Sequence, residues 1–510
     1  MNLFKSTTTF GFFTIISRIL GYIRDVFIAM YLGSGPLADA FFVAFRIPNT
    51  FRRLFSEGTF NAAFVPSYAS ELANGRDQSE KFATNIFSLL TITLFFLVLI
   101  IEIFMPLFIL LIAPGFSGDE GKINTAISLT RITFPFLLFV SLSSFFSAIL
   151  NSHNRFAVAA AAPVILNIFL ISVLIYGNIL GDKLVYYLSY AVTLAGLTQL
   201  FYLYFYVKKF YNPTFDFKNL INKKVKDFFS KLLPSIFSSG VTQINILIGT
   251  IIASFQTGAV SYLYYADRIY QINLAIAGIA IGTVILPQLS RLIETDDKSQ
   301  IVSIQNKALE LSLFLSIPAT IALFIASVPI VSSLFGYGSF DELSVEKSAL
   351  ALFYFAFGLP AFSLIKVFSS FFFARHNTKI PFYISLISVF INVLISVSFF
   401  QKLGFIIIPI ATSISSWFNA IILYVFLKKK DFFEFNDVFI FRFPRIFLSS
   451  LIMGLLFYFL VNFLEYKLIY IENYKFIYLL VCILIALLCY LGVSIFTKAF
   501  KLSDINLKYK

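Results

Sequence analysis

Charged residues are scarce in this chain of 510 residues, of which 13% are charged and 59% are hydrophobic. A soluble domain has about 25% charged and about 45–50% apolar residues, because a dissolved surface needs polar groups. The composition excludes a soluble multidomain enzyme, and it excludes disorder, which requires low hydrophobicity. Since about 20 apolar residues span the hydrocarbon layer as a helix, we predict an all-α polytopic membrane protein.

Residues that bind metals or nucleotides are also few. Cys482 and Cys489 lie in one apolar run, and His153 and His376 lie in short polar turns, so we expect no disulfide framework, no metal site and no cofactor. The segment nearest to a phosphate-binding loop, residues 115–122, has the wrong spacing. The chain also has no clustered basic soluble face of the kind that binds nucleic acid. We predict a protein that is not an enzyme, with no catalytic residues.

Apolar runs between polar breaks predict about fourteen transmembrane helices, most of them longer than a minimal span. Their expected ranges are 8–32, 37–68, 84–113, 123–150, 157–179, 184–207, 228–255, 259–290, 306–335, 344–373, 381–400, 405–427, 443–464 and 474–497.

Lysine and arginine in the loops predict the orientation, since cytoplasmic loops carry an excess of both. With the N-terminus inside, and with the first four residues of each span counted with the adjacent loop, 25 of the 39 Lys and Arg residues lie on the cytoplasmic side. Six lie on the outer side: Lys122, Lys183, Lys347, Lys402, Lys467 and Lys475. We therefore expect both termini in the cytoplasm. The net charge of +13 is then mainly a topology signal and an attraction to anionic membrane lipids.

The chain repeats itself with an offset of about 222 residues. Residues 44–47 (Ala-Phe-Arg-Ile) recur as residues 266–269 (Ala-Asp-Arg-Ile), and Asn154-Arg155 recurs as Asn377-Thr378. We predict two parallel six-helix lobes around a central cationic cavity, plus two extra C-terminal helices. The expected divisions are an N-terminal lobe over 1–209, a basic cytoplasmic linker over 210–227, a C-terminal lobe over 228–430, and spans 13 and 14 with a tail over 431–510.

Several charges fall inside predicted spans, where each costs about 2.5–3.5 kcal/mol. Cations outnumber acids: Arg18, Arg24, Arg46, Arg52, Arg53 and Arg268 accompany Asp25, Asp39, Glu57 and Asp267. Pairing of Arg24 with Asp39, or of Arg53 with Glu57, is a structural alternative for single residues. The surplus of arginine favours an anionic ligand such as pyrophosphate or carboxylate, which the guanidinium fork binds well.

These blocks resemble the MurJ (MviN) family of lipid II flippases, within the multidrug/oligosaccharidyl-lipid/polysaccharide exporter superfamily. The resemblance rests on seven segments: Ser17-Arg18-x-Leu20-Gly21-x-x-Arg24-Asp25, Asp39 to Asn49, Arg52-Arg53-Leu54-Phe55-x-Glu57-Gly58, Ala113 to Phe116, Asn151 to Phe156 with Ala162-Pro163, Tyr265 to Arg268, and Leu364 to Val367. It covers essentially the whole chain.

The resemblance implies a flippase in the bacterial cytoplasmic membrane that moves undecaprenyl-pyrophosphate-linked disaccharide-pentapeptide outward for cell-wall synthesis. It implies substrate binding by Arg18, Arg24, Arg52 and Arg268, whereas the helical wheel of span two favours Arg53 over Arg52. Supporting cavity or gate residues are then Ser17, Gly21, Asp25, Asp39, Arg46, Arg53, Glu57 and Asp267. A monovalent cation or the membrane potential is expected to drive transport, and the cell-wall synthesis machinery is an expected partner. Another exporter of the superfamily and a non-transporting scaffold are the alternatives.

Overall fold

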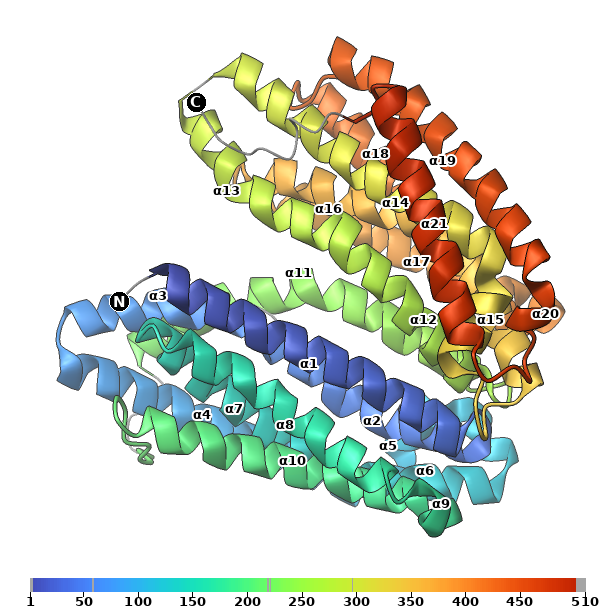
Figure 1. The fold of residues 1–510 in the computed structure, drawn as a ribbon. Coiled ribbons are helices and arrows are strands. Elements are labelled where there is room, and N and C mark those ends of the chain that lie inside the picture. The colour runs from blue at the N-terminus through green and yellow to red at the C-terminus, as the bar shows by residue number, and fades with distance from the viewer. Residues whose placement is uncertain (1–2, 57–58, 218–219, 221, 296, 501–510) are drawn as a thin grey trace. The chain divides into compact units, whose positions relative to one another are not determined.

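The structure is a computed structural model that describes residues 3–56, 59–217, 220, 222–295 and 297–500 (Figure 1). All regular elements in these ranges are helices. Eight of the described helical segments are long and apolar enough to cross a membrane, and a ninth arises if α15 and α16, which meet at a bend of 44°, form one span. The protein is therefore a helical, multi-pass membrane protein.

The chain divides into two compact units, over residues 1–261 and 262–510. Unit 1 holds the elements α1 (Leu3–Leu32), α2 (Pro36–Ser56), α3 (Thr59–Ala73), α4 (Arg76–Ile103), α5 (Met105–Ile112), α6 (Glu120–Thr133), α7 (Phe136–Ser152), α8 (Phe156–Leu174), α9 (Gly177–Leu180), α10 (Leu184–Val207) and α11 (Lys223–Ala253).

Unit 2 begins inside α12 (Ala259–Leu274), which continues through a π-helical segment, Ala275–Ala280, into α13 (Ile281–Glu294). The other helices of unit 2 are α14 (Lys298–Phe335), α15 (Glu342–Ala356), α16 (Leu359–Phe373), α17 (Lys379–Leu403), α18 (Ile407–Lys429), α19 (Asp437–Phe463), α20 (Glu465–Leu468) and α21 (Lys475–Phe496).

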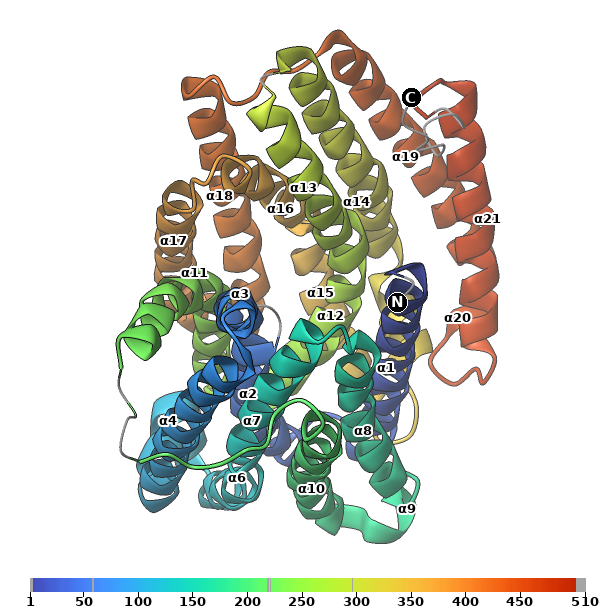
Figure 2. The same cartoon turned by 90° about the vertical axis from the view of Figure 1, so that its left-hand side faces the viewer.

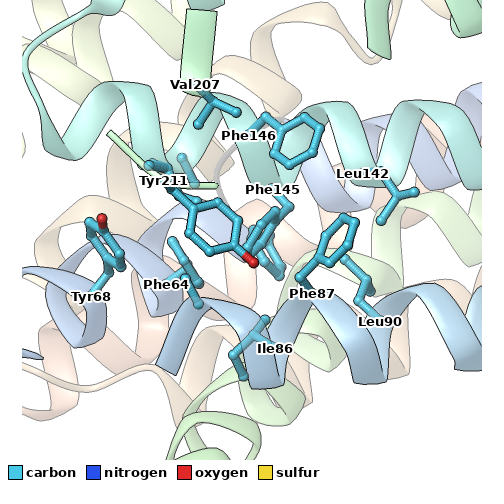
Figure 3. Packing of buried hydrophobic residues seen from close by; sticks show 14 of the residues in the cluster. Phe64, Tyr68, Ile86, Phe87, Leu90, Leu142, Phe145, Phe146, Val207 and Tyr211 are labelled. Atoms are coloured by element: carbon cyan, nitrogen blue, oxygen red, sulfur yellow. The ribbon is translucent and has the colours of Figure 1, made fainter. Parts of the chain in front are cut away.

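An aromatic core holds one end of unit 1 together (Figure 3). Phe64 of α3 meets Phe145 of α7 edge-on, with ring centroids 5.1 Å apart, and Phe87 of α4 packs on Phe145 at 5.7 Å. Phe228, from the first turns of α11, meets Phe64 at 6.1 Å. Since large aromatic side chains dominate such packing, the start of α11 is held in unit 1.

Within unit 2, α21 lies against α14 through a polar contact that a proline creates. Pro318 has no N–H, so the carbonyl of Phe314, four residues earlier in α14, lacks its helical donor. The hydroxyl of Tyr490 in α21 donates to this carbonyl oxygen at 2.7 Å. At the other end of α21, the ammonium of Lys475 donates to the carbonyl oxygen of Gly336 at 2.6 Å.

Each expected span range overlaps one helix or a pair of helices separated by a short break. The range 184–207 coincides with α10, whereas 37–68 covers α2 and α3, and 344–373 covers α15 and α16. How many of these helices cross the membrane stays a prediction. The packing boundary after residue 261 differs from the expected linker at 210–227, because α11 packs with α3 of unit 1 through the aromatic core.

The backbone supports the internal repeat. After α7, Asn154 adopts a left-handed conformation with φ 59°, and after α16, His376 does so with φ 55°. These positions differ by 222 residues. The next amide of each turn donates to the helix end, Arg155 to the Leu150 oxygen at 2.8 Å and Asn377 to the Phe372 oxygen at 3.0 Å. Both turns thus satisfy the final carbonyl groups of a helix in the same way.

Candidate functional site

Arg24 is the central charged residue of α1 and is 6% exposed. Its Nε and Nη2 donate to Oδ1 of Asp25 at 3.0 and 2.7 Å, and its Nη1 donates to Oδ1 of Asn167 at 2.9 Å. The guanidinium also lies 5.9 Å from the ring centroid of Phe45 in α2. Pairing explains how a charge is tolerated in an apolar helix. Because a guanidinium has five N–H donors, it retains capacity to bind an anion.

Asn167 of α8 joins Arg24 to the backbone of α1. Its Nδ2 donates to the carbonyl oxygen of Ser17 at 3.0 Å, while its oxygen accepts from Arg24. Gly21 lies opposite, and a Cβ built there would be 3.7 Å from the amide of Asn167, an ordinary contact distance. Ser17, Gly21 and Arg24 of α1 therefore all face Asn167 of α8.

The other predicted arginines of unit 1 differ in exposure. Arg18 is exposed and Arg46 is half-buried. Arg52 and Arg53 belong to α2, but their side chains lie outside the described set, and Glu57 lies outside the described residues. The choice between Arg52 and Arg53 therefore stays open.

Asp39 of α2 is fully buried and accepts hydrogen bonds from four donors. Oδ2 accepts from Nζ of Lys122 and from the amide of Gly258, both at 2.7 Å. Oδ1 accepts from the amide and the hydroxyl of Ser261, at 2.9 and 2.7 Å. The carboxylate thus caps the N-terminus of α12, where free N–H groups favour an anion.

The charged residues of α12 in unit 2 form hydrogen bonds with side chains one turn away in the same helix. Arg268 Nη2 donates to the hydroxyl of Tyr264 at 2.8 Å, and the guanidinium lies 4.8 Å from that ring centroid. Gln271 donates to the carboxylate of Asp267, one turn away. Both charged side chains are half-buried, so this turn of α12 combines a cation with hydrogen-bonding groups.

Two partners in the structure differ from those that sequence reasoning proposed. Arg24 pairs with Asp25 and Asn167 rather than with Asp39. Asp39 pairs instead with Lys122, which was expected in an outer loop but is 6% exposed. Sequence reasoning did not identify Asn167 as a partner of Arg24. Its position as a lone amide within an apolar helix is the signal that could have identified it.

No group of three or more His, Cys, Asp or Glu residues in the described part of the chain is arranged to hold a metal ion. Two chemical features remain. Arginine side chains are held by carboxylate, amide and phenol partners, and a buried carboxylate caps a helix. Such a set suits binding of an anionic group by arginine forks.

The fold defines a class, the helical membrane proteins that are built like exporters of the multidrug/oligosaccharidyl-lipid/polysaccharide superfamily. A solved multidrug-resistance MATE transporter in an inward-facing conformation matches with a TM-score of 0.63 at 15% identity, covering 81% of this chain and 94% of that chain. A likeness at this identity concerns the fold alone.

More specific matches identify the family. The family model described as Lipid II flippase MurJ matches residues 28–479. A probable lipid II flippase MurJ of Rhizobium meliloti is 40% identical over 91% of this chain and 87% of its own length. The lipid II flippase MurJ of Burkholderia cenocepacia is 31% identical over 91% of each chain. A solved lipid II flippase MurJ in an inward closed conformation gives a TM-score of 0.80 at 27% identity, covering 96% and 98% of the two chains. This chain belongs to the MurJ lipid II flippase family.

Proposed function

We propose that this protein translocates lipid II across the bacterial cytoplasmic membrane for peptidoglycan synthesis. The observation that carries the proposal is the match to the MurJ family over residues 28–479, supported by 40% identity to a curated member. Those residues include Arg46, Arg52 and Arg268, while Arg18 and Arg24 precede them. The substrate is an undecaprenyl pyrophosphate that carries a disaccharide-pentapeptide.

Arg18, Arg24, Arg52 and Arg268 are the proposed substrate-binding residues. A pyrophosphate offers oxygen acceptors in the geometry that a planar guanidinium binds with two parallel hydrogen bonds. Arg24 supports this role because Asp25 and Asn167 already fix its orientation. An anion bound by arginines of both lobes would offset their repulsion and stabilise the closed state. Such differential binding is what alternating access requires.

The proposed membrane arrangement has fourteen spans, two parallel six-helix lobes and both termini in the cytoplasm. The repeated turns at Asn154 and His376 support two equivalent lobes. The bias of 25 against 6 Lys and Arg residues in the loops supports the orientation. The lobes correspond to residues 1–209 and 228–430 of the repeat, although α11 packs with unit 1.

The membrane potential or a monovalent cation gradient is the proposed energy source. Movement of one charge through 100 mV provides about 2.3 kcal/mol, which is sufficient to bias a two-state equilibrium by more than tenfold.

The last two long helices, α19 and α21, are proposed to carry the prenyl tail of the substrate. Their outer surfaces are strongly apolar, with Phe459 66% and Leu488 69% exposed. The contacts of Lys475 and Tyr490 with α14 attach α21 to unit 2, so the surface would accompany this unit during transport. Protein partners in the cell-wall machinery would contact the exposed loops.

Two alternatives lead to different results in one experiment. Another exporter of the superfamily would fail to rescue cells depleted of their lipid II flippase. A non-transporting scaffold would give no lipid II flipping in vesicles, and its role in cells would tolerate the loss of Arg24. The identity to curated MurJ members favours the flippase over a multidrug exporter, for which the likeness is one of fold.

The test is lipid II translocation in vesicles, combined with rescue of depleted cells, for Arg24→Ala and Arg268→Ala. We expect both variants to insert and to lose flipping. Lysine at either position should restore only part of it, because an ammonium is a point charge without the bidentate fork. Arg76→Ala is the matched control, since its guanidinium side chain is 69% exposed and bonds only to a nearby glutamate, Glu80.

Full flipping by both alanine variants would contradict the binding model. Full flipping by the lysine variants would show that charge alone is sufficient. Thermal unfolding of each purified variant separates a loss of transport from a loss of folding.

A further inference from the structure

The chain between α10 and α11 forms a strap, residues 208–217, that lies along α4 (Figure 2). The hydroxyl of Tyr211 donates to Oγ1 of Thr84 at 3.3 Å, and the amide of Asp216 donates to Oγ of Ser88 at 3.0 Å. The ring of Phe215 packs on Phe87, with centroids 5.2 Å apart. These contacts attach the strap to α4, and Phe210 and Tyr211 also contact His153 and Phe145 at the end of α7.

The exposure of the neighbouring helices locates the strap at the edge of the hydrocarbon layer. Along α10, exposed Phe201 and Phe205 give way to exposed Lys208 and Lys209. Along α4, an exposed charged end that includes Lys81 gives way to exposed Phe95. Such a change from apolar to charged surface marks the boundary between hydrocarbon and headgroups, and the anchor residues Thr84 and Ser88 lie between the two zones of α4.

Two aromatic rings on the strap are exposed at this boundary. Phe215 is 54% exposed and Phe217 is 67% exposed. Their rings are stacked, with centroids 5.9 Å apart and an interplanar angle of 10°. Because the anchored backbone holds both rings outward, they form a flat apolar surface suited to the glycerol and upper acyl region of a lipid.

Three exposed cations lie beside the same strap. Lys208 and Lys209 begin it, and the guanidinium of Arg155 lies 5.8 Å from the ring centroid of Phe210. Asp216 is the only acidic residue in the strap. The two left-handed turns align Arg155 with Asn377, one residue before the Thr378 that sequence comparison aligns with it, and neither Asn377 nor Thr378 is charged.

We propose that this surface, formed by Arg155 and the strap, binds the headgroup of an anionic phospholipid. The cations would bind the phosphate, and Phe215 and Phe217 would contact the acyl region. Exposed basic residues beside interfacial aromatic rings are the arrangement that attracts anionic lipids. The site lies apart from Arg24 and Asp39, and the inference goes beyond the proposed flippase function and does not depend on it.

Native mass spectrometry of the full-length protein taken from vesicles of phosphatidylglycerol and phosphatidylcholine tests the proposal. We expect preferential retention of phosphatidylglycerol. In the triple variant Arg155→Gln, Lys208→Gln, Lys209→Gln, this preference should fall by about fivefold for each charge removed. Phe215→Ala with Phe217→Ala should also weaken retention of phosphatidylglycerol.

The matched control removes three lysines outside the strap, all of them expected in outer loops, with Lys183→Gln, Lys347→Gln and Lys402→Gln. Lys183 lies at the opposite end of α10 from Lys208, and we expect this control to retain the preference. Wild-type protein should lose it in about 1 M KCl, where the Debye length is about 3 Å, which tests the site without any substitution. Equal loss in both triple variants, or displacement of the lipid by inorganic phosphate at matched ionic strength, would overturn the proposal.

Discussion

Two segments of this protein follow equivalent paths with different side chains. The strap that follows α10 in unit 1 has a counterpart in the segment that follows α18 in unit 2, and Phe210 corresponds to Phe432 at an offset of 222 residues. In unit 1 the anchors are neutral hydroxyls and rings. Ser88 accepts from the strap at 3.0 Å, and the ring of His153 stacks on Phe210 with centroids 4.5 Å apart.

In unit 2 the equivalent anchors are amides and charges. Arg375, equivalent to His153, lies 4.5 Å from the ring centroid of Phe432 and donates to its carbonyl oxygen at 3.0 Å. Asn306, equivalent to Thr84, donates to the carbonyl oxygen of Glu434 at 2.8 Å. Glu310, equivalent to Ser88, forms a buried ion pair with Arg442 of α19.

The comparison shows that the repeat conserves backbone paths more than residue types. In both units a side chain lies over a phenylalanine ring. In unit 1 it is the histidine His153, which can titrate, and in unit 2 it is Arg375, which keeps its charge. The second anchor also differs in kind, since it is Ser88 of α4 in unit 1 and Glu310 of α14 in unit 2. Unit 2 has an additional helix to attach, α19, and the charge at Glu310 makes that attachment. Sequence comparison therefore detects only fragments of the repeat.

The largest difference between the units should appear when Arg442 is replaced. Arg442→Met leaves the carboxylate of Glu310, 7% exposed, without this partner, and we expect a loss of about 3–5 kcal/mol in stability. The double variant Arg442→Met, Glu310→Met should recover much of it, because an apolar pair leaves no buried charge. Thermal and denaturant unfolding in detergent measure both.

The exposed pair of Arg76 and Glu80 in unit 1 provides the matched control for this prediction. These side chains are 69% and 36% exposed, so Arg76→Met should change stability by less than about 0.5 kcal/mol. Equal effects of the two arginine substitutions would show that burial does not determine the anchoring in unit 2.

The sequence predicts the positions of the helices well, because long apolar runs and polar breaks are local signals. It predicts breaks within spans poorly. The π-helical segment at Ala275–Ala280 carries no separate hydropathy signal. Arg24 and Asp39 are recognisable as charges in apolar helices, but Asn167 and Lys122 are 143 and 83 residues away from them. Partners at such separations depend on tertiary packing, which no local pattern encodes.

A smaller effect is expected at the neutral anchor of unit 1. Ser88→Ala removes the acceptor of the Asp216 amide, and we expect a cost of about 1 kcal/mol that is concentrated in the strap. Hydrogen exchange should show faster exchange of the Asp216 amide. Ser172→Ala is the control, since this exposed serine donates only to its own helix at Ile168. An unchanged exchange rate at Asp216 would mean that Ser88 does not hold the strap.

The smallest effect expected is a dependence of stability on pH. It arises at His153 in unit 1, and the equivalent residue of unit 2, Arg375, does not produce it. Burial, with a further contribution from the charge of Arg76, lowers the pKa of His153 below its ordinary value. The folded protein therefore binds fewer protons at this site than the unfolded chain. Stability should be unaffected above the unfolded pKa of about 6.5 and should decrease as the pH falls from there toward the folded pKa.

The groups that face the ring of His153 explain why protonation is unfavourable. The hydroxyl of Tyr68 lies 3.2 Å from Nε2, Phe210 covers one side of the ring, and Arg76 and Arg155 add positive charge nearby. Unfolding measured between about pH 7.5 and 5.5 should show a steeper acid loss for the wild type than for His153→Gln. The equivalent Arg375 cannot titrate in this range, so Arg375→Gln should leave the slope unchanged. A wild-type slope equal to that of His153→Gln would remove the distinction between a titrating anchor in unit 1 and a permanently charged one in unit 2.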